Sequence, residues 1–467
     1  MTTEPPSTSA QATNSAAAPS QGGDLIPFRQ AVRVWFGISL QTFGGPAGQI
    51  AVMQRTLVEE RRWIGQRRFN HALSYCMLLP GPEAQQLAIY IGWLLNGTRG
   101  GLAAGTLFVL PGVLALLALS AIYVGWGSTT LITGLFAGLA PAVLAIVAQA
   151  VLRVGKRSLT HPAMIALAVA SFAALAVFAV PFPIVILAAA AAGWLLARVR
   201  PHVFAAKAKG GDDDGPAPLI ADDALHHEPP SRRRVVKVLG VGLAAWGIPL
   251  GVVALLTGGG SVFTTQGLYF SGAALVTFGG AYAVLAYVAQ SAVQTYGWLN
   301  PGEMVRGLAL AETTPGPLIM VVQFVAFVGA YRDPGGLNPW AAALLGALLT
   351  TWVTFTPCFL FIFLGAPYVE RLRGNRAISA ALTGITAAVV GVIANLAVYF
   401  AVHTLFRTVH DRDWGPVHLR IPELATWRPT ALAITVVAFV IIFGLRWSVL
   451  RTLGVCAMLG LAAALIW

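Results

Sequence analysis

Long apolar runs separated by short polar connections make up most of the chain, and this pattern predicts membrane-spanning helices. Each run is near the ~20 residues that an α-helix needs to cross the hydrocarbon core of a bilayer. Six runs precede a polar insert, at about 28–56, 70–95, 100–124, 129–152, 161–180 and 182–198. Seven follow it, at about 235–257, 265–294, 303–330, 338–366, 377–406, 429–445 and 447–467. The runs are continuous rather than alternating, which disfavours a β-barrel.

Composition excludes a water-soluble protein. The chain has 57% hydrophobic and 10% charged residues, whereas soluble proteins carry about 25% charged residues. The net charge of +12 lies mainly in connections between apolar runs, which is typical of cytoplasmic loops of a membrane protein and not of a nucleic-acid partner. The three cysteines lie far apart and form no Cys/His spacing, so we expect no metal and no cofactor.

Two polar segments stand outside the apolar runs. Residues 1–27 are rich in Ser, Thr, Ala, Pro and Gln and lack the features of a signal peptide, so we expect a disordered N-terminal tail. Residues 199–234 contain three consecutive aspartates and three consecutive arginines, which predicts a solvated cytoplasmic linker.

An internal repeat relates the two halves of the chain. The motif TFGG at 42–45 recurs at 277–280, Trp63 recurs as Trp298, and PGP at 80–82 recurs at 315–317, all at one offset of 235 residues without a gap. The Gly/Pro motifs repeat more faithfully than the apolar residues around them. The duplicated unit is therefore a pair of broken helices, and it divides the chain into a first repeat at 28–198, the linker, a connecting transmembrane helix at 235–262 and a second repeat at 263–467.

The charges indicate that the two repeats are inverted. The first copy carries five arginines in its connection, at positions 55, 61, 62, 67 and 68, whereas the equivalent positions of the second copy are Gln290, Tyr296, Gly297, Gly302 and Glu303. Equivalent loops are therefore expected on opposite sides of the membrane. If all thirteen segments crossed, the arginine-rich loop would lie outside, against this rule. The conflict disappears if the broken segments of each copy re-enter, or cross an even number of times together.

These features predict an all-α polytopic membrane protein of two inverted repeats with Gly/Pro-broken or re-entrant helices, about 10–13 membrane segments in all. Inverted repeats whose broken helices meet at the membrane midplane are the organisation of secondary transporters. No catalytic motif is present, so we do not expect an enzyme.

The PGP motifs are candidate anion sites. Proline removes a backbone N–H and fits the first turn of a helix, so each motif predicts a break followed by a new helix start, whose free N–H groups bind anions. An ordinary proline kink is the alternative for an isolated motif, and the recurrence favours the break. The candidate residues are Pro80, Gly81, Pro82, Thr313, Thr314, Pro315, Gly316 and Pro317.

The TFGG motifs permit an unwound backbone in the same way. Pro46 can open the next half-helix in the first copy, whereas Ala281 takes its place in the second. Close packing of helices against glycine is an equal alternative to contact with a ligand. The candidates here are Phe43, Gly44, Gly45, Pro46, Gly279 and Gly280.

Polar side chains near the breaks complete the candidate site. Gln49, Gln85, Gln86 and Gln323 are neutral donors in apolar runs, with hydrogen bonding inside the bundle as the alternative role. Glu83 and Glu312 are carboxylates at membrane depth, which is costly and points to function. Protonation would relieve their competition with a bound anion, so both are candidates for proton coupling. Glu83 is also compatible with a simple stabilising role at a helix N-terminus.

The motifs TFGGPAGQIAVM, LLPGPEAQQLAIYIGWLLNGTRGG, VTFGGAYAVLAYV and ETTPGPLIMVVQFVAFVGAY closely resemble the long-chain chromate ion transporter family of bacteria. The resemblance is strongest over 28–124 and 263–366. It implies a multi-pass carrier in the bacterial inner (plasma) membrane that moves chromate, usually outward, and confers chromate resistance. Ala281, in the slot of Pro46, is the one departure from the family's motifs. The motif positions fall here on Phe43, Gly44, Gly45, Pro46, Pro80, Gly81, Pro82, Glu83, Gln85 and Gln86, and on Phe278, Gly279, Gly280, Thr313, Thr314, Pro315, Gly316 and Pro317.

Other functions stay open at this stage. Sulfate or another oxyanion is the alternative substrate, and a membrane-embedded lipid-modifying enzyme is a remote alternative, which would carry acidic or histidine clusters in interfacial loops. The expected partners are a chromate or sulfate-like oxyanion and the lipid bilayer, and a homodimer is compatible with the sequence.

Overall fold

The computed structural model describes residues 25–199, 218–220, 225–226, 231–278, 280–368 and 376–466. The predicted disordered tail up to residue 24, most of the predicted linker and Gly279 lie outside the described residues.

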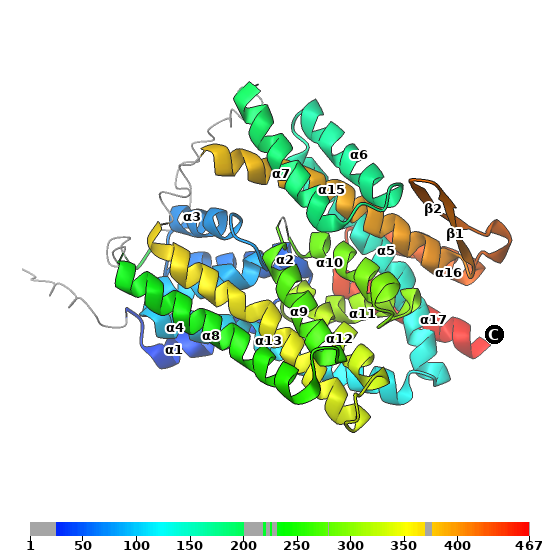
Figure 1. Ribbon diagram of the computed structural model, residues 1–467, viewed down its shortest axis with the longest axis horizontal. Coiled ribbons are helices and arrows are strands. Elements are labelled where there is room, and N and C mark those ends of the chain that lie inside the picture. The colour runs from blue at the N-terminus through cyan, green and yellow to red at the C-terminus, as the bar shows by residue number, and fades with distance from the viewer. Residues whose placement is uncertain are drawn as a thin grey trace, which may run out of the picture.

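The first half of the described chain is helical, as the apolar runs predict (Figure 1). Its helices are α1 (Phe28–Ser39), α2 (Gly45–Gln54), α3 (Gln66–Cys76), α4 (Glu83–Trp126), α5 (Thr130–Ser158), α6 (Pro162–Ala176) and α7 (Phe182–Val199). A π-helical segment, η1 (Arg55–Glu60), extends α2. Helix breaks lie at both Gly/Pro motifs, between α1 and α2 and between α3 and α4.

The second half repeats this pattern. Its helices are α8 (Arg232–Thr257), α9 (Val262–Leu275), α10 (Ala281–Gln290), α11 (Pro301–Thr313), α12 (Val321–Arg332), α13 (Pro339–Gly365), α15 (Arg376–Leu405), α16 (Pro429–Phe439) and α17 (Val449–Ile466). Short helical segments are η3 (Ser291–Thr295), η4 (Leu318–Met320), η5 (Ala366–Tyr368), η6 (Leu424–Thr426) and η7 (Val440–Gly444). Seven helices of the described chain are long and apolar enough to cross a membrane, which confirms the all-α polytopic class.

One small sheet was not expected. Strands β1 (Val409–Trp414) and β2 (Val417–Pro422) form an antiparallel hairpin in the polar connection between α15 and α16. Gly415 allows the tight turn, because it adopts a φ of 61° that other residues rarely take.

Helix α4 folds back on itself. Asn96 and Gly97 leave the helical conformation, with φ of 59° at Gly97, so α4 consists of two helices joined by a sharp turn. The two arms pack closely, since a Cβ at Gly92 would lie 2.5 Å from the carbonyl oxygen of Gly100. The first arm starts at the PGP motif and therefore runs back toward the side of the membrane at which α3 begins.

The loops of the first repeat gather at one end of the molecule. The side-chain amide of Asn96 donates to the carbonyl of Ile26 at 2.6 Å, which joins the turn of α4 to the start of α1. Two described parts of the linker dock at the same end. The N–H of Leu219 donates to the carbonyl of Arg62 at 2.7 Å, and the N–H of His226 donates to that of Leu94 at 2.8 Å. The linker is thus not wholly solvated, because Leu225 is also buried there.

The loops of the second repeat gather at the other end. Arg332 donates to the carbonyl of Trp298 at 3.3 Å, and the rings of Tyr331 and Trp340 lie 5.2 Å apart, so the loops around α10–α13 adjoin one another. Tyr123, near the end of the second arm of α4, donates to Glu303 in the same region. About 39 Å of helix, at 1.5 Å per residue, separates Gly97 from Tyr123. The two sets of half-helices therefore enter from opposite sides, as the arginine contrast predicts.

The breaks of the two repeats meet through reciprocal hydrogen bonds. The N–H of Gly81 donates to the carbonyl of Thr277 at 2.7 Å, and the N–H of Gly316 donates to that of Thr42 at 3.0 Å. These four residues are related by the 235-residue offset of the repeat, so each PGP motif binds the TFGG motif of the other copy. Backbone groups at membrane depth have no water to bind, and the two copies satisfy each other.

The inverted arrangement predicts a labelling pattern for one pair of equivalent positions. Glu60 and Thr295 are both exposed and occupy matching places in the repeat. We expect Glu60→Cys to react with a membrane-impermeant maleimide in everted vesicles and Thr295→Cys to react in intact cells. The native cysteines are buried and should give little background. Reaction of both variants from the same side would contradict the inversion.

Candidate functional site

A cavity of about 160 Å³ lies where half-helices of the two repeats begin. Its wall includes Pro46 of α2, Gly81 and Glu83 at the start of α4, and Gly280 and Tyr282 at the start of α10. Pockets for drug-sized ligands usually measure about 300–1,000 Å³. The smaller volume suits a small inorganic ion.

Three helix N-termini converge on this cavity. Helix α2 begins after Gly44, which has a φ of 78°, α4 begins after Pro82, and α10 begins after Gly280, which has a φ of 101°. No side chain caps any of the three starts. Each helix start carries roughly half a positive charge on its free N–H groups. The cavity is therefore positive before any side chain is counted, and it favours an anion.

Two arginines of α5 add full positive charge. Arg153 and Arg157 line the cavity, are four residues apart and so lie on one face of the helix. Both are exposed, which places them at the mouth. Arg153 donates to the side chain of Gln149 at 3.0 Å, and Arg157 contacts the sulfur of Met77 at 3.3 Å. Neither forms an ion pair with a described residue, so both charges remain available for a ligand.

Two carboxylates oppose this positive field. Glu83 lies beside the start of α10, because a Cβ at Gly280 would be 3.6 Å from its Oε1 atom. Glu312, at the end of α11, is fully buried and accepts a hydrogen bond of 2.6 Å from the hydroxyl of Tyr282. Its second oxygen has no partner among the described residues. Arg157 acts electrostatically on Glu83, and Arg153 acts on Glu312.

The structure brings some of the predicted binding residues together at this cavity. Pro46, Gly81, Glu83 and Gly280 line it. Gly45 lies at its edge, since a Cβ there would be 3.8 Å from the Tyr282 hydroxyl. The remaining motif residues of the first copy adjoin these in the chain and are Phe43, Gly44, Pro80 and Pro82.

The predicted glutamines mostly hold the breaks in place. Gln49 donates to the carbonyl of Gly316 at 2.5 Å, Gln86 donates to that of Pro80 at 2.7 Å, and Gln323 donates to that of Val113 at 3.0 Å. Gln85 differs, because it is buried and neither its oxygen nor its nitrogen has a partner in the described part of the chain. None of the four lines the cavity.

The second PGP motif lies away from the cavity. Thr313 lines a separate apolar cavity with Tyr123 and Phe136. The hydroxyl of Thr313 donates to Leu310 at 2.7 Å and that of Thr314 to Ala311 at 3.0 Å, so both protons are used within the helix. Gly316 and Pro315 pack on Gly112 of α4 instead. Our sequence hypothesis treated the two PGP motifs as equivalent, and the structure separates them.

Arg153, Arg157 and Tyr282 line the cavity but were not among the sequence candidates. Arg153 and Arg157 belong to a basic cluster after an apolar run, which is typical of a cytoplasmic loop and by itself indicates membrane orientation and not binding. Tyr282 replaces Ala47 of the first copy at the 235-residue offset. A polar residue at a position where the two copies of the repeat differ was the sequence signal that could have identified Tyr282.

Comparisons with known proteins agree with the motifs. A sequence profile described as "Chromate transporter" matches residues 29–194 and 264–463. A "Chromate transport protein" of Pseudomonas aeruginosa is 31% identical over 401 residues, which cover 83% of each chain. A protein of the same description from Cupriavidus metallidurans is 28% identical over 80% of this chain and 82% of its own.

The similarity also extends to an archaeon. An uncharacterized transporter of Methanocaldococcus jannaschii is 23% identical over 87% of each chain. No solved structure matches the chain.

The reciprocal bonds between the breaks predict the effect of removing glycine. Gly81 and Gly316 have φ of 125° and 102°, which other residues rarely adopt. A Cβ at Gly81 would in addition lie 2.8 Å from Nε2 of Gln86 and 3.0 Å from Sγ of Cys358. We expect Gly81→Ala and Gly316→Ala each to cost about 1–3 kcal/mol of stability, with Gly81→Ala the more damaging.

Thermal unfolding of the purified protein in detergent measures this cost. Gly272→Ala in α9 is the matched control, because nothing lies within 4 Å of its added Cβ. Equal stability of all three variants would mean that the breaks do not depend on glycine.

Proposed function

Because the chain belongs to the chromate transporter family, we propose that it is a secondary transporter of the bacterial inner membrane that moves chromate outward and thereby confers chromate resistance. The substrate is a tetrahedral dianion. The proposed binding site is the cavity between α2, α4, α5 and α10.

One observation supports this proposal more strongly than the others. Helix starts from both inverted repeats and two arginines without ion pairs in the described chain face the same small cavity. Separately, each of these features has an ordinary structural role. Together they supply backbone N–H donors and guanidinium donors, which are the groups that bind oxyanions in proteins.

The inverted architecture supports an alternating-access mechanism. Arg153, Arg157 and Ser158 lie at the end of α5 that adjoins the basic connections, so the cavity mouth faces the proposed cytoplasmic side. The first repeat contributes α2 and α4 and the second contributes α10, so rocking of one repeat against the other would change the side to which the anion is exposed.

Glu83 is the proposed coupling group. Its carboxylate lies beside the positive start of α10, where an anion would bind. An ionised carboxylate there competes with the substrate, and a proton removes the competition. Binding of the oxyanion would then be linked to protonation, and a pH gradient could drive transport. Glu312 lies behind Tyr282 and is the second candidate.

Sulfate is the second candidate substrate. The lining offers positive charge and N–H donors, and both tetrahedral dianions would accept hydrogen bonds from them. The family is one of transporters, which favours transport over the lipid-modifying enzyme considered from the sequence.

We expect the arginines of α5 to determine affinity for the anion. Arg153→Gln and Arg157→Gln each remove a charged donor, which should raise the apparent KM for chromate about ten- to hundredfold. Lys156→Gln is the matched control, because this substitution removes the same charge from the same helix turn at a residue that does not line the cavity. Chromate uptake into everted vesicles, with sulfate as competitor, measures the effect.

Equal effects of all three substitutions would indicate a general surface potential and contradict the proposed site. If sulfate inhibits uptake at concentrations equal to those of chromate itself, the transporter is one of tetrahedral oxyanions and not of chromate alone.

The substitution Glu83→Gln tests the coupling. Glutamine resembles the protonated acid, so we expect this variant to bind chromate but to transport it with little dependence on the pH gradient. Exposed Glu59 supplies the control Glu59→Gln, which should keep the dependence. Retention of full pH dependence in Glu83→Gln would exclude Glu83 as the coupling group.

A further inference from the structure

A second, larger cavity lies at the end of the molecule opposite the proposed cytoplasmic mouth. It has a volume of about 340 Å³ and is enclosed by α5, α11, α15, α16 and α17. Helix α5 contributes to both cavities, through Thr133–Pro141 here and through Ala150–Ser158 at the central one. The second cavity is therefore a separate site on the other half of the same helix.

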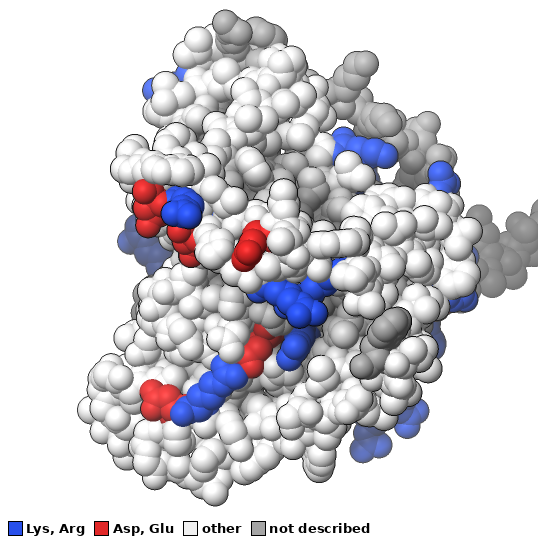
Figure 2. Space-filling model, turned by 90° about the vertical axis from the view of Figure 1, so that its right-hand side faces the viewer, with Lys and Arg blue, Asp and Glu red and all other residues white. Residues whose placement is uncertain are grey.

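Positive charge surrounds the mouth of this cavity. Arg306 of α11 and Arg428, directly before α16, line it, and Arg407 is close enough to act electrostatically on Arg428. None of the described residues in the lining is Asp or Glu. Figure 2 views this end of the molecule and shows Lys and Arg side chains near the middle of the face, with Asp and Glu side chains beside them. None of the three arginines forms an ion pair in the described chain.

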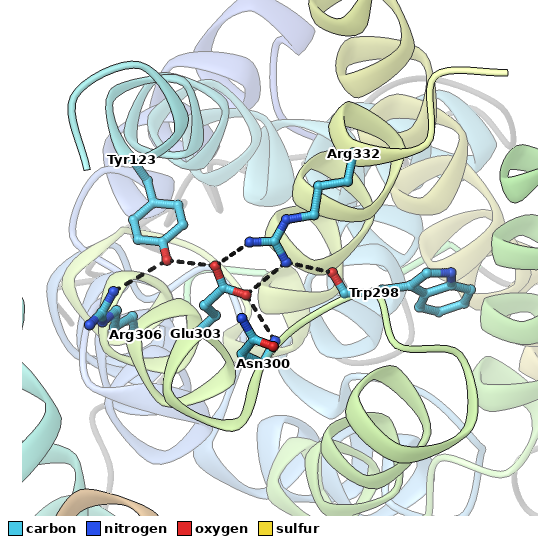
Figure 3. Close-up of polar contacts among 6 residues, drawn as sticks. All are labelled: Tyr123, Trp298, Asn300, Glu303, Arg306 and Arg332. Carbon is cyan, nitrogen blue, oxygen red and sulfur yellow. Dashed lines mark hydrogen bonds and ion pairs between the residues drawn. The ribbon is translucent and has the colours of Figure 1, made fainter. Parts of the chain in front are cut away.

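The acidic residue closest in sequence does not neutralise Arg306. Glu303 lies one turn earlier on α11, but its carboxylate is already held by Arg332 at 2.6 and 2.8 Å and by the hydroxyl of Tyr123 at 3.0 Å (Figure 3). It also accepts the backbone N–H of Asn300 at 2.8 Å. Among the described residues, the hydrogen bond of Arg306 is to the Tyr123 hydroxyl, at 3.4 Å, and its guanidinium also lies 5.9 Å from the centre of the Phe136 ring. Its guanidinium therefore keeps unused donors for a ligand.

Most of the remaining lining is apolar and includes Phe136 and Pro141 of α5, Ile434 of α16, and Ala463 and Ala464 of α17. The other polar residues of the lining are Thr133, His403, Thr404 and Thr430. About 12 Å of helix separates Thr133 from Pro141 at 1.5 Å per residue, so the cavity extends along about two turns of α5. Many outward-facing side chains of α16 and α17 are exposed and apolar, including Val436 and Met458, which is typical of a surface that faces lipid.

From this distribution we propose that the second cavity binds an anionic phospholipid. The phosphate group lies between Arg306 and Arg428, and one acyl chain occupies the apolar part against α5 and α17. Arginine binds phosphate through paired N–H donors, and basic pockets between transmembrane helices are a recognised setting for anionic headgroups.

A free oxyanion fits this cavity less well than a lipid does. The central cavity is small and offers helix N-termini on several sides, whereas this cavity is about twice as large and most of its lining is apolar. An amphipathic ligand satisfies both parts. This proposal concerns a different set of residues from the transport site and does not depend on the substrate of the protein.

Native mass spectrometry of the full chain with phosphatidylglycerol tests the proposal. We expect the wild-type protein to retain a bound phosphatidylglycerol in preference to phosphatidylcholine. The double variant Arg306→Gln/Arg428→Gln should weaken its binding at least tenfold, because two charged donors are lost. The control Arg412→Gln removes a charge from exposed strand β1, outside the cavity, and should leave binding unchanged.

A second variant separates a lipid from a free anion. Ala463→Phe would fill the apolar part without changing any charge, so it should weaken phosphatidylglycerol binding severalfold. Unchanged lipid binding in both the double variant and Ala463→Phe would overturn the proposal. The proposal would also be overturned by a second result. In that case inorganic phosphate would bind the wild type without displacing lipid, and only the arginine substitutions would reduce the affinity for phosphate. Thermal unfolding in phosphatidylcholine checks that each variant is folded.

Discussion

The structure depends on the need to satisfy backbone groups where helices stop inside a membrane. Each repeat provides a hydrogen-bond partner for the other, because the N–H of Gly81 donates to the carbonyl of Thr277 and the N–H of Gly316 donates to that of Thr42. Glycine at positive φ lets the chain present its N–H there, and proline starts the next helix without an N–H to satisfy. Gln49 and Gln86 bind further carbonyls at the same breaks. The pairing is reciprocal, so each repeat satisfies a backbone N–H at the break of the other.

Where the two repeats differ, the symmetric framework becomes a binding site. The starts of α2, α4 and α10 line the central cavity, but the start of α12 does not. Tyr282, which lines the cavity, takes the place of Ala47. Its hydroxyl donates a hydrogen bond to Glu312 and so connects this carboxylate to the lining. Arg153 and Arg157 approach from α5, which lies outside the duplicated motifs. The resulting cavity has a basic mouth, with one carboxylate, Glu83, in its lining and a second, Glu312, bound to Tyr282.

Two arginine side chains line each cavity, but their surroundings differ. Arg153 and Arg157 face helix N-termini and a carboxylate, which together can bind and release a small anion. Arg306 and Arg428 lie above an apolar channel, which suits the two-part chemistry of a phospholipid. Beside the second cavity, the Glu303–Arg332 pair joins α11 to α12, so Glu303 does not pair with Arg306.

The sequence by itself determined the helical membrane class, the repeat, its inversion and the positions of the breaks. Each of these follows from local chemistry, namely the length of apolar runs, the backbone properties of Gly and Pro, and the sign of loop charges. Only the tertiary structure decided which breaks share a cavity. It placed Thr313 in a separate apolar pocket and brought Arg153 and Gly280 to one cavity, because packing of helices distant in the chain, and not the spacing of motifs, determines which side chains meet.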